Sequence, residues 1–168
     1  MTPDNYDISY QLTHDIDWFG IQNGVPFHVA SNGDLIPEQI KEHVNQRNQT
    51  YVAQTPQVLS AEDILINERW LNEQKERYSR GISSSNNRES QLQFDREAYL
   101  RSFAGFARKG FVSIDNSFIG DKYVYKIVAY PKKYRDRFCC SKNMELPEIS
   151  LENLKGLNVD VWNINKNE

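Results

Sequence analysis

The spacing of apolar residues predicts a β-hairpin near the start of the chain. Apolar and aromatic residues dominate residues 16–22 and 25–31, and Asn23-Gly24 lies between the two runs. Asn-Gly is the strongest signal for a two-residue type I′ turn, because both central positions need positive φ. We therefore expect two antiparallel strands that close on this dipeptide.

The register set by the turn makes two further predictions. Phe27 lies opposite Gly20, where the missing side chain leaves room for the ring. Ile21–Pro26 is a pair without mutual hydrogen bonds, so Pro26 lacks its N–H on the side away from the first strand. The second strand is therefore expected to begin at a sheet edge.

The same reading predicts helices in the middle of the chain and strands toward both ends. The expected helices cover residues 37–47, 60–80 and 89–109, with an irregular stretch at 48–59. The other expected strands cover residues 6–12, 111–115, 123–130 and 158–164. This order favours a single α+β domain over residues 1–168. We expect a largely antiparallel sheet of about five or six strands, with helices packed on one face.

Composition narrows the class of protein. Charged residues make up 26% of the chain and hydrophobic residues 39%, which excludes a disordered tail. No apolar run approaches the roughly 20 residues that span a bilayer, so no membrane contact is expected. The two cysteines, Cys139 and Cys140, are adjacent, so they cannot link distant segments and lack the spacing of a metal site. These features favour a cytoplasmic protein without a metal or cofactor.

Charge is distributed unevenly along the sequence. Residues 101–142 contain ten basic and three acidic residues, a local net charge of +7, whereas the rest of the chain carries −10. Such a split indicates either a polarised surface or two parts of the chain that attract each other.

Asp17 and His28 are the first candidate site residues. In the predicted hairpin they are diagonal neighbours on one face, close enough for a hydrogen bond from the imidazole to the carboxylate. Such a pair can orient a general base or a ligand. The alternative is a structural histidine at a sheet edge that a nearby acid holds in place. A metal site would need His14 and Asp15 together with His28. Residues of opposite parity point to opposite faces of a strand, so no metal site is predicted.

Residues 27–40, FHVASNGDLIPEQI, resemble the histidine-bearing first strand and following helix of ADP-ribosyltransferase-like enzymes. The resemblance implies that His28 helps to hold NAD, with Ser31 as its neighbour. It assigns no catalytic glutamate in this chain. The alternative function is therefore a nucleotide- or NAD-using enzyme with His28, Asp17 and Ser31 in its site.

The chain also resembles a group of small bacterial proteins from gut Bacteroidetes. The shared features are the DIDWF…HVAS opening and an ARKGF segment, here Ala107 to Phe111. This resemblance implies no activity and adds no catalytic residues. It favours an accessory or mobile-element gene product.

A basic segment near the end of the second predicted β-rich region is the second candidate site. Basic and aromatic residues are interleaved in KKYRDRF, residues 132–138. Contact with the phosphates and nucleobases of a nucleic acid is therefore physically reasonable. The alternative is a solvated connection that faces acidic helices. An isoelectric point near 5.7 makes nucleic acid the less favoured partner.

The leading interpretation is a non-enzymatic protein that binds a protein or another anionic macromolecule through a charge-polarised surface. The expected partner-binding residues are Lys132, Lys133, Arg135 and Arg137.

Overall fold

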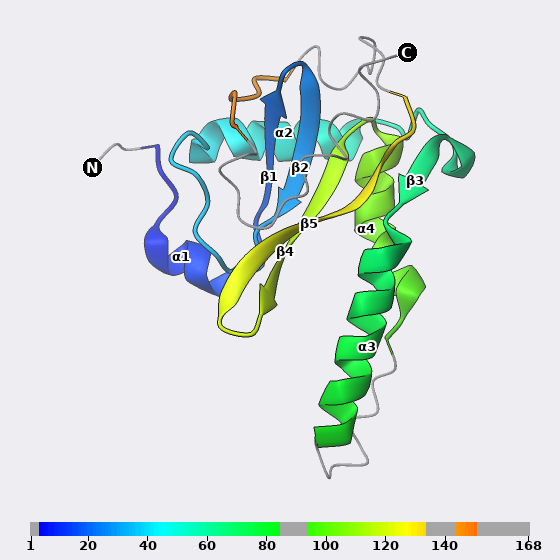
Figure 1. Cartoon of the computed structure of the whole chain (residues 1–168). Helices are drawn as coiled ribbons and strands as arrows, with labels where there is room; N and C mark the ends of the chain where they lie inside the picture. The colour runs from blue at the N-terminus through cyan, green and yellow to red at the C-terminus, as the bar shows by residue number, and fades with distance from the viewer. Residues whose placement is uncertain (1–3, 85–93, 134–143, 151–168) are drawn as a thin grey trace.

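The computed structural model describes residues 4–84, 94–133 and 144–150 (Figure 1). The described helices are α1 (Ile8–Thr13), α2 (Glu42–Gln54), α3 (Glu68–Ser84) and α4 (Arg96–Arg108). The described strands are β1 (Asp17–Gln22), β2 (Val25–Ala30), β3 (Ile64–Ile66), β4 (Val112–Ile119) and β5 (Lys122–Pro131).

All five described strands form one sheet in the order β1-β2-β4-β5-β3. The pairs β1–β2, β4–β5 and β3–β5 are antiparallel, whereas β2 and β4 are parallel. A parallel pair needs a long crossover, and here the chain between β2 and β4 supplies α2, β3, α3 and α4. The expected α+β class with a largely antiparallel sheet is confirmed.

The predicted hairpin is confirmed in its register. Asn23 and Gly24 both have positive φ, 50° and 79°, and Gly20 lies opposite Phe27. Pairing between β2 and β4 begins only at Phe27, so Pro26 lies before the ladder on that side. Its missing N–H therefore disrupts no described pairing with β4, as the sequence predicted.

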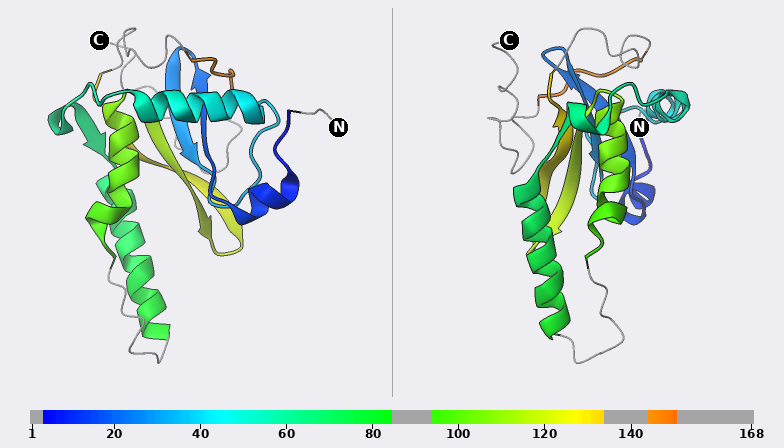
Figure 2. Two further views of the ribbon diagram at one scale, coloured as in Figure 1. Left: turned by 180° about the vertical axis from the view of Figure 1, so that it is seen from behind. Right: turned by 90° about the vertical axis from the view of Figure 1, so that its right-hand side faces the viewer.

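Helices α2 and α4 cover one face of the sheet, which is seen from behind in Figure 2. On this face α4 packs Leu100, Phe103 and Ala107 against the sheet. The opposite face buries Trp18, Phe27, Val29, Val112 and Ile114 in a second apolar layer. Helix α3 extends beyond the sheet, away from α1 (Figure 1).

The expected strand at residues 6–12 is wrong, because this segment forms α1. The Asp7 carboxylate accepts a hydrogen bond from the Tyr10 backbone N–H at 3.0 Å and caps the helix. Ile8 and Leu12 remain exposed, so their regular spacing does not mark the buried face of a strand. The alternation of apolar residues was therefore misleading here.

The helix expected at residues 37–47 also lies elsewhere, at Glu42–Gln54, and extends through the stretch expected to be irregular. Its buried positions are Asn45, Asn48 and Val52. Two of these three side chains are amides that donate to backbone carbonyls of other segments. A pattern of apolar residues cannot indicate a helix whose buried face is partly polar.

The helix expected at residues 60–80 is divided. Ser60 caps only a short 3₁₀ turn, Ala61–Asp63, and Ile64–Ile66 then form β3 against the end of β5. Helix α3 begins after this strand and continues past Gly81. The three residues of β3 form backbone pairs with β5. This tertiary pairing outweighs the helical pattern of their apolar side chains.

The helix expected at residues 89–109 begins later, after the N-cap Asp95. Its C-terminal end is as predicted, because Gly110 follows with φ of 103°. The two predicted strands that follow are confirmed as β4 and β5. Cys139, Cys140 and the strand expected at 158–164 lie outside the described residues. Within the described ranges, no helix has the length and apolar character that crossing a bilayer requires.

Candidate functional site

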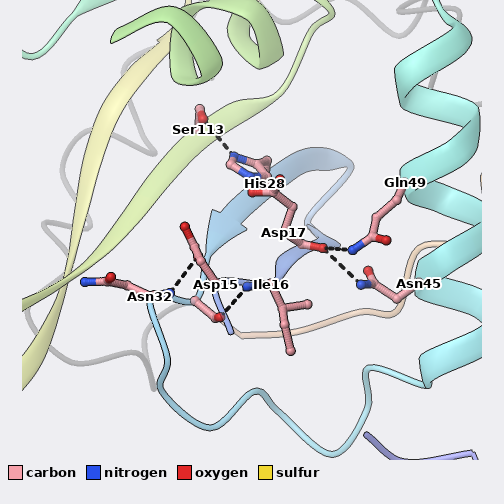
Figure 3. A network of polar contacts seen from close by, with 9 residues as sticks. Asp15, Ile16, Asp17, His28, Asn32, Asn45, Gln49 and Ser113 are labelled. Carbon is pink, nitrogen blue, oxygen red and sulfur yellow. Dashed lines mark hydrogen bonds and ion pairs between the residues drawn. The ribbon is translucent and has the colours of Figure 1, made fainter. Parts of the chain in front are cut away.

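The hairpin brings Asp17 and His28 into direct contact, as their diagonal positions predicted. His28 Nε2 lies 2.7 Å from Asp17 Oδ1 (Figure 3). The backbone of Asp17 is fixed from the other side, because Asn45 and Gln49 of α2 both donate to its carbonyl oxygen. The sequence therefore correctly predicted this pair, and the tertiary structure adds the support from α2.

The second ring nitrogen of His28 contacts a residue that the sequence did not indicate. His28 Nδ1 lies 2.8 Å from Ser113 Oγ, and the two residues are partners in the parallel ladder of β2 and β4. A carboxylate accepts hydrogen bonds, so Nε2–H donates to Asp17, while Nδ1 and the Ser113 hydroxyl share the second hydrogen bond. The three side chains form one hydrogen-bonded chain across β1, β2 and β4 (Figure 3).

The burial of Asp17, His28 and Ser113 determines what chemistry these three side chains can perform. His28 and Ser113 are both fully buried, whereas the Asp17 side chain is 47% exposed. The imidazole also stacks on Phe106 of α4, with 3.7 Å between ring centroids. In a serine–histidine–aspartate triad the serine hydroxyl meets the substrate and the aspartate is buried. Here the exposure is reversed, because the serine is buried and the aspartate is partly exposed. The three hydrogen-bonded side chains therefore connect β1, β2 and β4.

Ser31, the third residue of the enzyme alternative, extends the pairing of the hairpin. Its backbone N–H donates to the Ile16 carbonyl at 3.0 Å, and its hydroxyl accepts from the Ile16 N–H at 2.8 Å. Ser31 is buried, and no described contact joins it to His28. The structure therefore brings Asp17 to His28 and gives Ser31 a separate role at the end of the strands.

The remaining residues of the predicted opening also lie apart from His28. His14 stacks on Tyr10 of α1, and Asp15 accepts from the Asn32 backbone N–H at 2.8 Å. Among the described residues, no group of three or more histidine, cysteine, aspartate or glutamate side chains could hold a metal ion.

A second polar group lies beside the first on the face covered by α4. The Tyr99 hydroxyl donates to Asp115 Oδ2 at 2.6 Å and accepts from Trp70 Nε1–H at 2.8 Å. Burial raises the pKa of Asp115 above its usual range, and the Tyr99 hydrogen bond and the nearby His28 and Arg77 oppose this rise. Burial, together with the Asp115 charge, also raises the pKa of Tyr99.

The pairing of the strands places these acids in one row. Asp17 is opposite Ala30, Ala30 is opposite Asp115, and Asp115 is opposite Lys126. The sequence held a signal for part of this row, because polar residues alternate in β4 at positions 113, 115 and 117. That alternation indicates a polar strip on one face, but it does not indicate which side chains the strip contacts.

The predicted partner-binding residues lie at the end of β5. Lys132 and Lys133 are exposed, and the Lys132 backbone N–H donates to the Asp63 carbonyl at 2.9 Å. This bond and the pairing of Pro131 with Ile64 fix the point where the basic segment leaves the sheet. Arg135 and Arg137 lie outside the described residues.

A cleft of about 440 Å³ lies where α3 begins beside β5, and His28 is not among its lining residues. Its walls include Trp70, Tyr125 and Tyr130, and Lys126 Nζ lies 5.5 Å from the centre of the Trp70 ring. The hollow is therefore associated with the α3–β5 junction and not with the histidine.

Comparisons with known proteins place the chain in no family. No protein-family model matches it, and neither the curated proteins nor the solved structures contain a significant match.

Proposed function

We propose that this chain is a non-enzymatic accessory protein that binds an anionic macromolecular partner, in the first place a protein. The contact surface is the basic segment at the end of β5, with Lys132, Lys133, Arg135 and Arg137. The observation that carries the proposal is the exposure of Lys132 and Lys133 at a point anchored by β3.

The pattern of ion pairs supports this interpretation. Glu68 pairs with Arg96, Glu73 with Arg69 and Glu76 with Arg80, so bases outside the basic segment already neutralise these acids. Helix α3 itself carries three acidic and four basic residues, so it is not an acidic pole opposite the basic segment. The first 40 residues contain six acids and no lysine or arginine, and they form that pole instead.

Part of the acidic pole lies far from the end of β5. The end of β5 and helix α1 are widely separated in Figure 1 and in both views of Figure 2. The distance between α1 and the end of β5 supports the proposal, because separated charges of opposite sign polarise the surface of a protein.

Replacement of the four bases by serine tests the proposal. We expect Lys132→Ser, Lys133→Ser, Arg135→Ser and Arg137→Ser together to abolish binding of a labelled polyglutamate peptide. The midpoint of thermal unfolding should remain nearly unchanged. Binding of the peptide to the unaltered protein should weaken as salt rises past about 0.1 M, where the screening length falls to about 10 Å.

A matched variant removes four exposed bases elsewhere, namely Arg69, Lys75, Arg101 and Lys122. It should bind polyglutamate almost normally. Equal losses in both variants would reduce the effect to net charge and contradict the proposal. Tighter binding of single-stranded DNA than of polyglutamate would assign the surface to nucleic acid instead.

The enzyme alternative has one observation in its favour, namely the Asp17–His28 hydrogen bond. Burial of the imidazole opposes it, since a buried ring that bonds through both nitrogens has no free nitrogen for a ligand. A titration with NAD, monitored by tryptophan fluorescence, distinguishes the enzyme from the non-enzymatic binding protein. Saturable binding that is lost in His28→Gln would favour the enzyme, and we expect none.

A further inference from the structure

Helix α1 exposes apolar residues and buries a polar one. Ile8 is 63% exposed and Leu12 is 57% exposed, whereas Gln11 is 7% exposed. Gln11 Nε2 donates to the Tyr6 carbonyl, and Gln11 Oε1 accepts from the Ile36 N–H, both at 2.9 Å. A surface helix normally turns its apolar side toward the core. The inverted arrangement of α1 therefore leaves Ile8 and Leu12 exposed in the described part of the structure.

The loop after β2 enlarges this surface. The bond from Ile36 to Gln11 holds the loop against α1, and Gly33 lies so close that a Cβ there would be 3.4 Å from the Leu12 carbonyl oxygen. This loop presents Leu35, whose side chain is 51% exposed. We call Ile8, Leu12 and Leu35 the α1 patch. Clustered exposed apolar side chains with a polar rim are typical of interaction sites.

Acidic residues are adjacent in the sequence to two of the three members of the α1 patch, Ile8 and Leu35. Asp7 precedes Ile8 and caps the helix, Asp34 precedes Leu35 and accepts from its N–H, and Glu38 follows the loop. The first 40 residues supply no lysine or arginine to balance these acids. An apolar centre with a negative rim is complementary to a surface that is apolar at its centre and positive around it.

We propose that the α1 patch docks a basic amphipathic segment of a partner protein, with apolar side chains on the patch and lysine or arginine at its rim. Helix docking on an apolar surface is a common mode of peptide recognition. The acidic rim disfavours an anionic membrane, because like charges repel. This surface is distinct from the basic segment at the end of β5 and does not depend on it.

A labelled synthetic helix of leucine and lysine probes the α1 patch, with a leucine–glutamate helix of the same pattern for comparison. We expect the lysine helix to bind in fluorescence anisotropy and the glutamate helix not to bind. Amide shifts in NMR spectra should map the contact to α1 and the following loop. The double variant Ile8→Ser, Leu12→Ser should weaken binding by about tenfold or more, as expected for central interface residues.

Matched variants keep the test independent of folding. Val58→Ser removes an apolar side chain of similar exposure, 47%, and should bind normally. Glu38→Gln should weaken binding of the lysine helix, whereas Glu97→Gln on α4 should not. The proposal is overturned if the glutamate helix binds equally, if the shifts map elsewhere, or if Ile8→Ser, Leu12→Ser binds normally. It is also overturned if the α1 patch instead binds a second copy of the chain or neutral phosphatidylcholine vesicles.

Discussion

Gly20 and Phe27 face each other across the hairpin, and a Cβ at Gly20 would lie 2.6 Å from Phe27 Cζ. The Phe27 ring is fully buried and contacts the edge of Trp18, so it cannot move away freely. Glycine is required here for space and not for a special backbone angle. The packing of the first two strands therefore depends on one absent side chain.

We predict that Gly20→Ala lowers the free energy of unfolding by about 1–3 kcal/mol, the usual range for overpacking a core. Urea denaturation measures the change. Gly105→Ala is the matched control, because its Cβ would lie 3.5 Å from Gln57 Nε2, an ordinary contact. Within α4 this control should raise stability by up to about 1 kcal/mol. A Gly20→Ala protein as stable as the unaltered one would contradict the packing argument.

His28 shows that a histidine can be held firmly without being available to a ligand. Its buried ring bonds to Asp17 and Ser113 and stacks on Phe106, so neither nitrogen is open to a ligand. Removal of one partner leaves a buried polar atom without a bond, which costs about 1–3 kcal/mol. The residue is best understood as a fixed link between strands.

We predict from this that Ser113→Ala destabilises the protein by about 1–3 kcal/mol, because His28 Nδ1 loses its buried partner. Denaturant unfolding of this variant should be compared with Ser102→Ala, which alters an exposed serine of α4 and should change little. If Ser113→Ala were neutral, the hydrogen bond to His28 would not be a structural link.

At the scale of elements, one hydrogen-bonded group joins three of them. Trp70 of α3 donates to Tyr99 of α4, which donates to Asp115 of β4. The carboxyl group is buried, and burial raises its pKa in the folded state. The contact that unites these elements therefore includes a group whose charge the fold disfavours.

The raised pKa of Asp115 fixes the sign of a pH effect. The folded state favours the protonated carboxyl, so this contribution to stability is complete below the unfolded pKa of about 3.9 and is lost as pH rises through the folded pKa. Asp115→Asn cannot ionise, and its carbonyl still accepts from Tyr99. We therefore predict that this variant gains stability relative to the unaltered protein between about pH 4 and pH 7.

Urea unfolding of the two proteins across this pH range gives the difference directly. Asp121→Asn, at an exposed position between β4 and β5, serves as the control for loss of one negative charge. A difference between Asp115→Asn and the unaltered protein that stays constant with pH would contradict the raised pKa.

At the scale of the whole molecule, a net charge of −3 conceals two poles. The acidic pole includes α1 and the hairpin region, and the basic pole lies at the end of β5 (Figure 1). A charged matrix interacts most strongly with the protein charges nearest to it, because Coulomb attraction weakens with distance. The molecule should therefore bind to both positively and negatively charged matrices.

We predict that the protein binds both an anion exchanger and a sulfonated cation exchanger at neutral pH and low salt. Lys132→Ser, Lys133→Ser should elute earlier from the cation exchanger, because these residues belong to the exposed basic pole. Lys75→Ser, Lys122→Ser removes the same charge elsewhere and should shift elution less. Equal shifts would show that net charge alone controls retention.

The sequence by itself determined the features that depend on neighbouring residues. Asn23-Gly24 set the turn, and the turn set the register that brings Asp17 to His28. Gly110 likewise marked the end of α4, because it has a positive φ there and glycine adopts positive φ without strain. In each case the deciding interaction acts over a few residues, so the local pattern contains it.

Only the tertiary structure decided the features that join distant segments. Ser113 reaches His28 through the parallel pairing of β2 with β4, and no local pattern encodes which strand becomes that neighbour. Asn45 is buried in α2 because it bonds to the backbone of β1, so its polarity conceals the buried face of the helix. Ile64–Ile66 form a strand because they pair with the end of β5 at that edge of the sheet. These outcomes depend on contacts that exist only after the chain has folded, which is why the sequence predicted the hairpin and its histidine pair but not their surroundings.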